Sequence, residues 1–190
     1  MFPLKYKCLD WDLLQKGNYS LIPIRFEDRL SIMQWRNDQI DILRQKDFLT
    51  QEKQTEYFTN VVSKLFCENK PDQILFSLLL NNELIGYGGL VHINWIDKNA
   101  EISFLLSTER NRDKDVFISE WKLFLSMVKE IAFKYLSFNK IYTYAFDLRP
   151  HLYTALLESN FVEEACLKDH VFINNSFYNV LIHSLFNERN

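Results

Sequence analysis

Two apolar stretches, ILFSLLL at residues 74–80 and LIGYGGLVHI at residues 84–93, decide the fold of this 190-residue chain. Each stretch has the length and the apolar character of a β-strand. Asn81 and Asn82 lie between them, and asparagine tolerates the positive φ angles of a tight hairpin. The sequence therefore predicts an antiparallel β-hairpin over residues 74–93.

A third strand is predicted at residues 100–106, after a turn at 95–99. Alternation along this strand places Ala100, Ile102, Phe104 and Leu106 on one face and Glu101, Ser103 and Leu105 on the other. The apolar spacing beyond it predicts a long helix over 116–138, a strand over 141–146, a helix over 150–158 with proline in its first turn, and two closing strands over 161–168 and 177–185.

The segment before the hairpin predicts one strand and two helices. A strand is expected over 19–25 and a helix over 26–35, which ends where Asn37 and Asp38 break the apolar spacing. A short apolar piece follows over 40–43, and Thr50 is the expected N-cap of a second helix that runs to about residue 67.

This element order predicts an α+β fold with a mixed, mostly antiparallel twisted sheet of about seven strands and helices on both of its faces. We expect one domain over residues 19–187, preceded by an N-terminal extension over residues 1–18.

Composition excludes several classes of protein. The net charge of −3 and the pI near 5.8 lack the basic excess of a nucleic-acid binder. No two of the three cysteines form a CxxC motif. The spacing typical of metal ligands is also missing among His151, His170 and His183, so we expect no metal site. No apolar run approaches the ~20 residues of a membrane span, and the N-terminus lacks a signal-peptide core. We therefore expect a cytoplasmic protein without membrane or nucleic-acid partners, as a monomer or homodimer.

Several short segments, in this order along the chain, resemble the GNAT N-acetyltransferase superfamily. They are most similar to the branch that includes ribosomal-protein N-terminal acetyltransferases and nucleotide-amino-sugar acetyltransferases. The segments are QWRND at 34–38, IGYGGL at 85–90, AEISF at 100–104 and LESNF at 157–161, the last with Asn160 where the family usually has glycine. The likeness extends over about residues 19–185.

The resemblance implies transfer of an acetyl group from acetyl-CoA to a primary amine. It favours a small-molecule acceptor such as an amino sugar or its nucleotide. A protein N-terminus is the alternative acceptor within the enzyme class. A second alternative is a degenerate GNAT domain that serves as a non-catalytic binding module.

The resemblance also implies where acetyl-CoA binds. Pantetheine would lie along the strand edge formed by Phe104, Leu105, Leu106 and Ser107, in the manner of an added strand. A backbone N–H group near Leu105 would polarise the thioester carbonyl, and the diphosphate would lie at the N-terminus of the following helix, near Val116.

The phosphate loop departs from the family pattern, because Asp113 and Asp115 occupy the two positions where small residues are usual. In one interpretation the side chains of Arg110, Arg112 and Lys114 bind the phosphates in place of the backbone. In the alternative the segment is an exposed charged loop, with Asp115 as the N-cap of the helix. The loop can also be shifted by one or two residues.

Candidate catalytic residues follow from the resemblance and from the need to deprotonate an amine. Glu101 is the candidate base, with a structural ion pair as its alternative role. The family's acid tyrosine falls at Leu156, so Tyr153, one helical turn earlier, is the candidate acid or a core residue. Asp147 or Arg149 aligns with a family asparagine or positions the turn at Pro150. The candidate acceptor-binding residues are Trp35, Arg36, Asn37 and His92.

Overall fold

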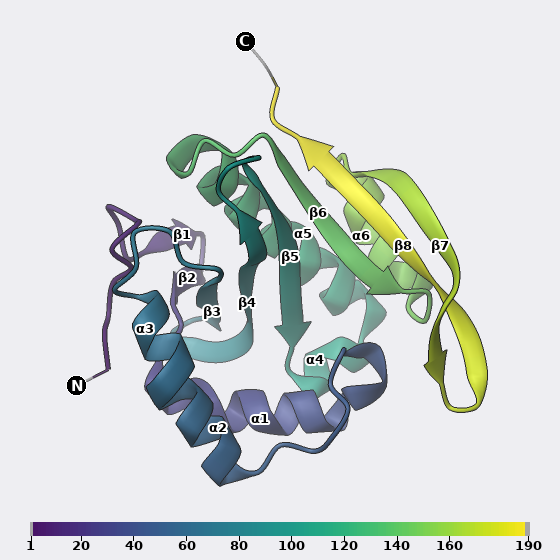
Figure 1. Ribbon diagram of the computed structural model, residues 1–190, viewed down its shortest axis with the longest axis horizontal. Coiled ribbons are helices and arrows are strands. Elements are labelled where there is room, and N and C mark those ends of the chain that lie inside the picture. Colours follow the sequence, from purple (N-terminus) through teal and green to yellow (C-terminus); the bar gives the residue numbers. More distant parts are fainter. Residues whose placement is uncertain (1, 189–190) are drawn as a thin grey trace.

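The computed structural model describes residues 2–188, which form a sheet of eight strands covered by helices on both faces (Figure 1). The strand order is β1-β2-β3-β4-β5-β6-β8-β7, and every neighbouring pair is antiparallel except β5 and β6, which are parallel. The predicted mixed, mostly antiparallel sheet is therefore confirmed. The strands are β1 (Leu14–Lys16), β2 (Tyr19–Pro23), β3 (Ile74–Leu80), β4 (Glu83–Asn94), β5 (Asn99–Leu106), β6 (Lys140–Phe146), β7 (Val162–Ile173) and β8 (Ser176–Phe186).

The sheet has one strand more than the seven expected, because the three residues of β1 pair with β2 within the segment we assigned to an N-terminal extension. The same segment adds Tyr6 to the core. Its hydroxyl donates a hydrogen bond to the Leu75 carbonyl at 3.1 Å, and its ring stacks on Phe66 with the centroids 4.0 Å apart. Three residues are too few for an alternation pattern, which is why β1 left no signal in the sequence.

The helices lie in two layers. The first layer contains α1 (Arg29–Asp38), α2 (Gln51–Tyr57) and α3 (Ser63–Leu65), and a π-helical turn (Phe58–Val62) joins the last two. The second layer contains α5 (Lys114–Glu130), which continues into a π-helical turn (Ile131–Tyr135), and α6 (Pro150–Glu158). Between β5 and α5 the chain forms the short helix α4 (Thr108–Arg112), where the sequence predicted a loop.

The local signals in the sequence correspond to observed geometry. Asn81 and Asn82 have φ angles of 51° and 70° in the β3–β4 turn, as a tight hairpin requires. The Thr50 hydroxyl accepts a hydrogen bond from the Lys53 N–H at 3.3 Å and caps α2. The break expected at Asn37 is wrong, because α1 runs on to Asp38.

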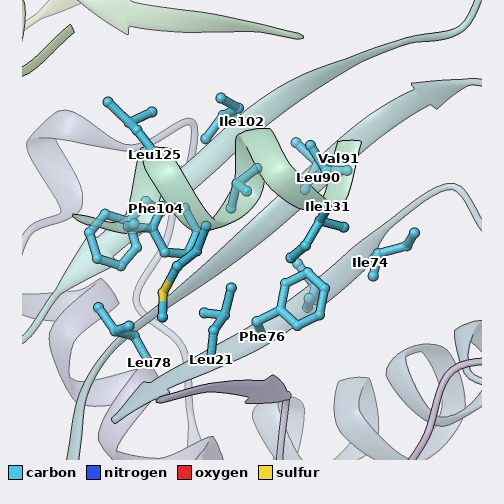
Figure 2. Close-up of a cluster of buried hydrophobic side chains, with 14 of the residues drawn as sticks. Leu21, Ile74, Phe76, Leu78, Leu90, Val91, Ile102, Phe104, Leu125 and Ile131 are labelled. Atoms are coloured by element: carbon cyan, nitrogen blue, oxygen red, sulfur yellow. The ribbon is translucent and has the colours of Figure 1, made fainter. Parts of the chain in front are cut away.

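The hydrophobic core lies between the sheet and α5 (Figure 2). On β5 the predicted alternation is confirmed, because Phe104 faces this core and stacks on Phe124 of α5 with the ring centroids 3.9 Å apart. Glu101 projects to the opposite face, where it meets the segment between α1 and α2. Alternation along β5 thus determines which of its side chains pack in the core and which face the α1–α2 layer.

No helix among residues 2–188 is long and apolar enough to cross a membrane. The same residues contain no cluster of three or more histidine, cysteine or acidic side chains that could hold a metal ion.

Candidate active site

The strands β5 and β6 part soon after they meet, and the opening between them positions the site. Their parallel pairing covers Asn99↔Lys140, Ala100↔Ile141 and Glu101↔Tyr142, whereas β5 continues to Leu106 and β6 to Phe146. The two strands diverge visibly in Figure 1. Because unpaired strand edges expose backbone hydrogen-bonding groups, this opening suits an extended ligand.

A cavity of about 460 Å³ occupies the opening, which is a volume typical of small-molecule sites. Ile102 to Phe104 of β5 and Thr143 to Phe146 of β6 form its sides. The α1–α2 layer contributes polar and aromatic side chains, and the α5–α6 layer contributes Trp121, Arg149 and Leu152. The cavity therefore passes between the strands from one helix layer to the other.

The edge of β5 presents backbone groups to the cavity in a defined order. The Ser107 N–H donates to the Ile85 carbonyl at 2.8 Å, so the backbone of Ser107 is directed toward β4. Along an antiparallel pair, the backbone N–H and C=O groups of successive residues point alternately toward and away from the partner strand. The backbone groups of Leu105 therefore also point toward β4, whereas those of Phe104 and Leu106 point toward the opening. The Leu106 carbonyl accepts a hydrogen bond from the Gln39 side chain at 3.0 Å. The donor next to Leu105 that borders the cavity is therefore the N–H of Phe104.

Two buried polar atoms of the cavity wall fit a ligand with amide groups. The Thr143 hydroxyl and the Trp121 indole nitrogen are both buried, and neither has a hydrogen-bond partner within residues 2–188. A buried polar group without a partner costs stability, so a ligand that bonds to these atoms gains from satisfying them. The two amides of a pantetheine chain are groups of this kind.

Glu101 lies in the cavity wall on the α1–α2 side. Its side chain is 6% exposed, pairs with the Arg44 guanidinium and lies with Oε2 3.9 Å from His92 Nε2. Burial raises the pKa of Glu101, and the electrostatic effects of the Arg44 guanidinium and of His92 oppose that rise. A carboxylate with a raised pKa is a better proton acceptor, so this position suits a general base. Arg44 also stacks on Tyr144, with its guanidinium carbon 4.6 Å from the ring centroid.

Tyr153 does not line the cavity. Its hydroxyl donates to Asp147 Oδ1 at 2.9 Å, and its ring stacks on His183 of β8 at 5.2 Å between centroids. Burial and the hydrogen bond to Asp147 raise the pKa of Tyr153. Leu156, at the position of the family's tyrosine, is fully buried. Of the two roles predicted for Tyr153, acid or core residue, its position outside the cavity and its packing against the core favour the second.

Arg110 is turned toward Glu120 of α5. Its guanidinium forms a two-pronged ion pair with Glu120 of α5, with Nε 2.7 Å from Oε2, and Glu120 is buried. This hydrogen bonding raises the pKa of Arg110. The ion pair with Glu120 occupies the guanidinium that we expected to bind phosphate. No local pattern in the sequence indicated this partner, which lies ten residues further along the chain.

The start of α5 is capped by Asp113, and not by Asp115 as the charged-loop alternative predicted. Asp113 Oδ1 accepts hydrogen bonds from the N–H groups of Asp115 at 3.0 Å and Val116 at 3.1 Å. These are the helix donors that an anion would otherwise bind. Arg112 and Lys114 are exposed beside this cap.

Arg149, which the sequence indicated either at the position of a family asparagine or as a residue of the Pro150 turn, supplies a cation near the start of α5. It precedes α6 and lines the cavity, and its guanidinium carbon lies 5.6 Å from the ring centroid of Phe117, in the first turns of α5. Burial lowers the pKa of Arg149 to about 10, and it forms no ion pair with the described residues. His151 packs edge-on against the same ring at 4.4 Å.

Two of the four predicted acceptor-binding residues line the cavity. Arg36 donates to the Tyr87 hydroxyl at 2.8 Å and to Gln45 Oε1 at 2.9 Å, and His92 lies beside Glu101 at the rim. Asn37 instead donates from Nδ2 to the Leu49 carbonyl and accepts at Oδ1 from the Leu49 N–H. These two hydrogen bonds hold the loop between α1 and α2. Trp35 is half-buried and is not part of the cavity wall.

Comparisons with known proteins identify the family and agree with the fold. A family model described as an acetyltransferase (GNAT) domain matches residues 22–182. The chain is similar in structure to spermidine N-acetyltransferase from Vibrio cholerae in complex with CoA and spermine, with a TM-score of 0.76, 20% identity, and coverage of 90% of this chain and 96% of that one. It is also similar to ribosomal-protein-S5-alanine acetyltransferase from Vibrio fischeri, with a TM-score of 0.73, 17% identity, and coverage of 93% and 97%.

A third similar structure is the ribosomal L7/L12 α-N-protein acetyltransferase in complex with coenzyme A, with a TM-score of 0.75, 12% identity, and coverage of 92% and 98%. No curated protein sequence matches the chain. The resemblance inferred from the four short segments is confirmed by the family match.

Proposed function

Because the chain belongs to the GNAT acetyltransferase family and uses acetyl-CoA as its co-substrate, we propose that it acetylates the primary amine of a small molecule. The observation that carries this proposal is the cavity between β5 and β6, with buried Glu101 in its wall. An amino sugar or its nucleotide is the first acceptor to test. A protein N-terminus remains the alternative acceptor.

On the cofactor side, the proposal assigns the pantetheine chain to the opening beside Phe104. The Phe104 N–H would donate to the thioester carbonyl oxygen, where negative charge develops as the amine attacks. Thr143 and Trp121 supply polar atoms along the chain. Arg149, together with Lys114 at the start of α5, supplies positive charge for the diphosphate, because the capped helix N-terminus offers few free donors.

On the acceptor side, Glu101 serves as the base. An amine near neutral pH is mostly protonated and must lose a proton before it attacks. Glu101 accepts that proton, directly or through one water. The neutral amine then attacks the thioester carbonyl, the C–N bond forms as the C–S bond breaks, and the second proton that the nitrogen must lose to become an amide passes to solvent. The thiolate of coenzyme A departs and takes its proton from solvent, so no side chain has to act as the acid.

A thiol-release assay with acetyl-CoA tests the proposal across a panel of amines. The panel contains amino sugars, nucleotide-linked amino sugars, polyamines and short peptides, and calorimetry measures CoA binding separately. We expect release above the hydrolysis background with at least one small amine. Release with peptides alone would assign the protein-acetylating function, and CoA binding without release from any amine would assign the non-catalytic module.

A further inference from the structure

The α1–α2 side of the cavity carries more positive than negative charge, although the whole chain has a net charge of −3. Its wall on this side contains the cations Arg36, Arg44 and Lys53 and, among the described residues, the single carboxylate of Glu101. Three cations against one carboxylate leave a net charge of +2 with His92 neutral. The charge balance of this wall is therefore opposite in sign to that of the chain.

The carboxylate is already neutralised by a partner. Glu101 forms its ion pair with Arg44, whose guanidinium is also held over the Tyr144 ring. A protonated amine that enters this part of the cavity thus finds no unpaired negative charge to bind. Repulsion from the remaining cations disfavours a polycationic acceptor.

Arg36 is a fixed cation with neutral partners. Tyr87 and Gln45 accept two of its five N–H groups, and no carboxylate within residues 2–188 lies in ion-pair distance of it. The remaining N–H groups form a planar fork that matches two oxygens of a phosphate or carboxylate. The two neutral partners therefore hold Arg36 in place without using its charge.

Lys53 adds a second cation at the rim. It lies in the first turn of α2, is exposed and lines the cavity. Its neighbours Glu52 and Glu56 belong to the same helix but are not part of the cavity wall. The ammonium group is thus available to an anion at the entrance.

We propose that the acceptor is an amine that also carries an anionic oxygen group, a phosphate or a carboxylate, which Arg36 and Lys53 bind while its amine reaches Glu101. This inference rests on the proposed function, since it specifies the acceptor of the same reaction. The proposed acceptor carries a negative charge, whereas polyamines are cations. The substrate of this protein would therefore differ in charge from spermine, which is bound in a structure of similar fold.

Paired acceptors test the inference in the thiol-release assay. Glucosamine 6-phosphate is compared with glucosamine, a nucleotide-linked amino sugar with its free amino sugar, an α-amino acid with its amide, and spermidine stands alone. We expect the anionic member of a pair to have at least a tenfold higher kcat/KM. The amino-acid pair distinguishes a carboxylate from a phosphate as the bound group.

Variants identify the residues that bind the anion. Lys53→Glu and Arg36→Gln should lower kcat/KM for the anionic acceptor by roughly 10- to 100-fold, the range of one charge-assisted hydrogen bond, without changing the KM of acetyl-CoA. Arg36→Lys keeps the charge and should recover part of the loss. Lys64→Glu is the matched control, because Lys64 is exposed in the same helical segment and does not line the cavity.

Three different results refute three different statements. Equal or better use of glucosamine or spermidine, with release intact, refutes the anionic acceptor and leaves the acetyltransferase function standing. Thiol release from no amine at all refutes the small-amine function itself. Unchanged kinetics in both Lys53→Glu and Arg36→Gln, with anionic acceptors preferred, would place the anion elsewhere and refute the assignment to these two residues.

Discussion

Replacement of Glu101 by glutamine separates the proposed catalytic role of this carboxylate from its structural role. Glutamine keeps the shape of the side chain and one oxygen that can accept from Arg44, but it cannot take a proton. A general base contributes about 10²- to 10⁴-fold to the rate, so kcat of Glu101→Gln should fall by at least about 100-fold. The KM of acetyl-CoA should stay constant, because Glu101 lies on the α1–α2 side of the cavity.

The structure also fixes the sign of the stability change. Arg44 is 47% exposed, so water solvates it after the substitution and the lost ion pair is worth less than about 1 kcal/mol. The pKa of Glu101 is raised by burial, which means that its charged form disfavours folding above the unfolded-state pKa. Glutamine removes that charge, so the midpoint of thermal unfolding at pH 7 should be equal or higher, and not lower.

The assay measures kcat from pH 5 to pH 9 for the wild type, Glu101→Gln and the control Glu83→Gln, which alters an exposed residue at the start of β4. The wild-type rate should decline on the acidic side as Glu101 is protonated, and Glu101→Gln should lose that limb. A kcat within threefold of the wild type at every pH would refute Glu101 as the base. A thermal midpoint several degrees lower would refute the estimate of its structural role.

Three further substitutions address the surroundings of the cavity. Arg149→Gln should weaken CoA binding by about tenfold in calorimetry, the effect of losing one charge-assisted contact with a phosphate, and an unchanged Kd would place the diphosphate elsewhere. Asp113→Ala should destabilise the protein by about 0.5–2 kcal/mol in urea unfolding, because α5 loses its N-cap, and should leave CoA binding equal or tighter. Arg44→Gln removes a charge that lowers the pKa of Glu101, so the acidic limb of the rate profile should move to higher pH, and an unmoved limb would contradict the electrostatic coupling.

Local rules of sequence account for most of the fold. Asn81 and Asn82 marked the hairpin because their conformational tolerance is a property of the residues themselves. Thr50 marked a helix start for the same reason, and alternation placed Glu101 on the face opposite Phe104. These features depend on neighbours within a few residues, so a single sequence contains enough information to predict them.

The electrostatic partners in the site depend on distant parts of the chain, and no local rule predicts them. Arg44 lies 57 residues from Glu101, in the segment between α1 and α2. Arg110 turned toward Glu120 because α4 folds back against α5, a turn that the charged loop did not indicate. Whether Tyr153 points into the cavity depends on how α6 is rotated about its own axis. The apolar periodicity of so short a helix does not determine that rotation.

Residues of both helix layers line the cavity, so the opening between β5 and β6 connects the two faces of the sheet. In the proposed arrangement the thioester would reach this opening from the side of α5, and the amine would reach it from the side of α1 and α2. Either partner is then able to arrive first, and neither has to leave for the other to enter. The steady-state kinetics should accordingly show intersecting double-reciprocal lines, the pattern of a ternary complex, rather than the parallel lines of an acetylated enzyme.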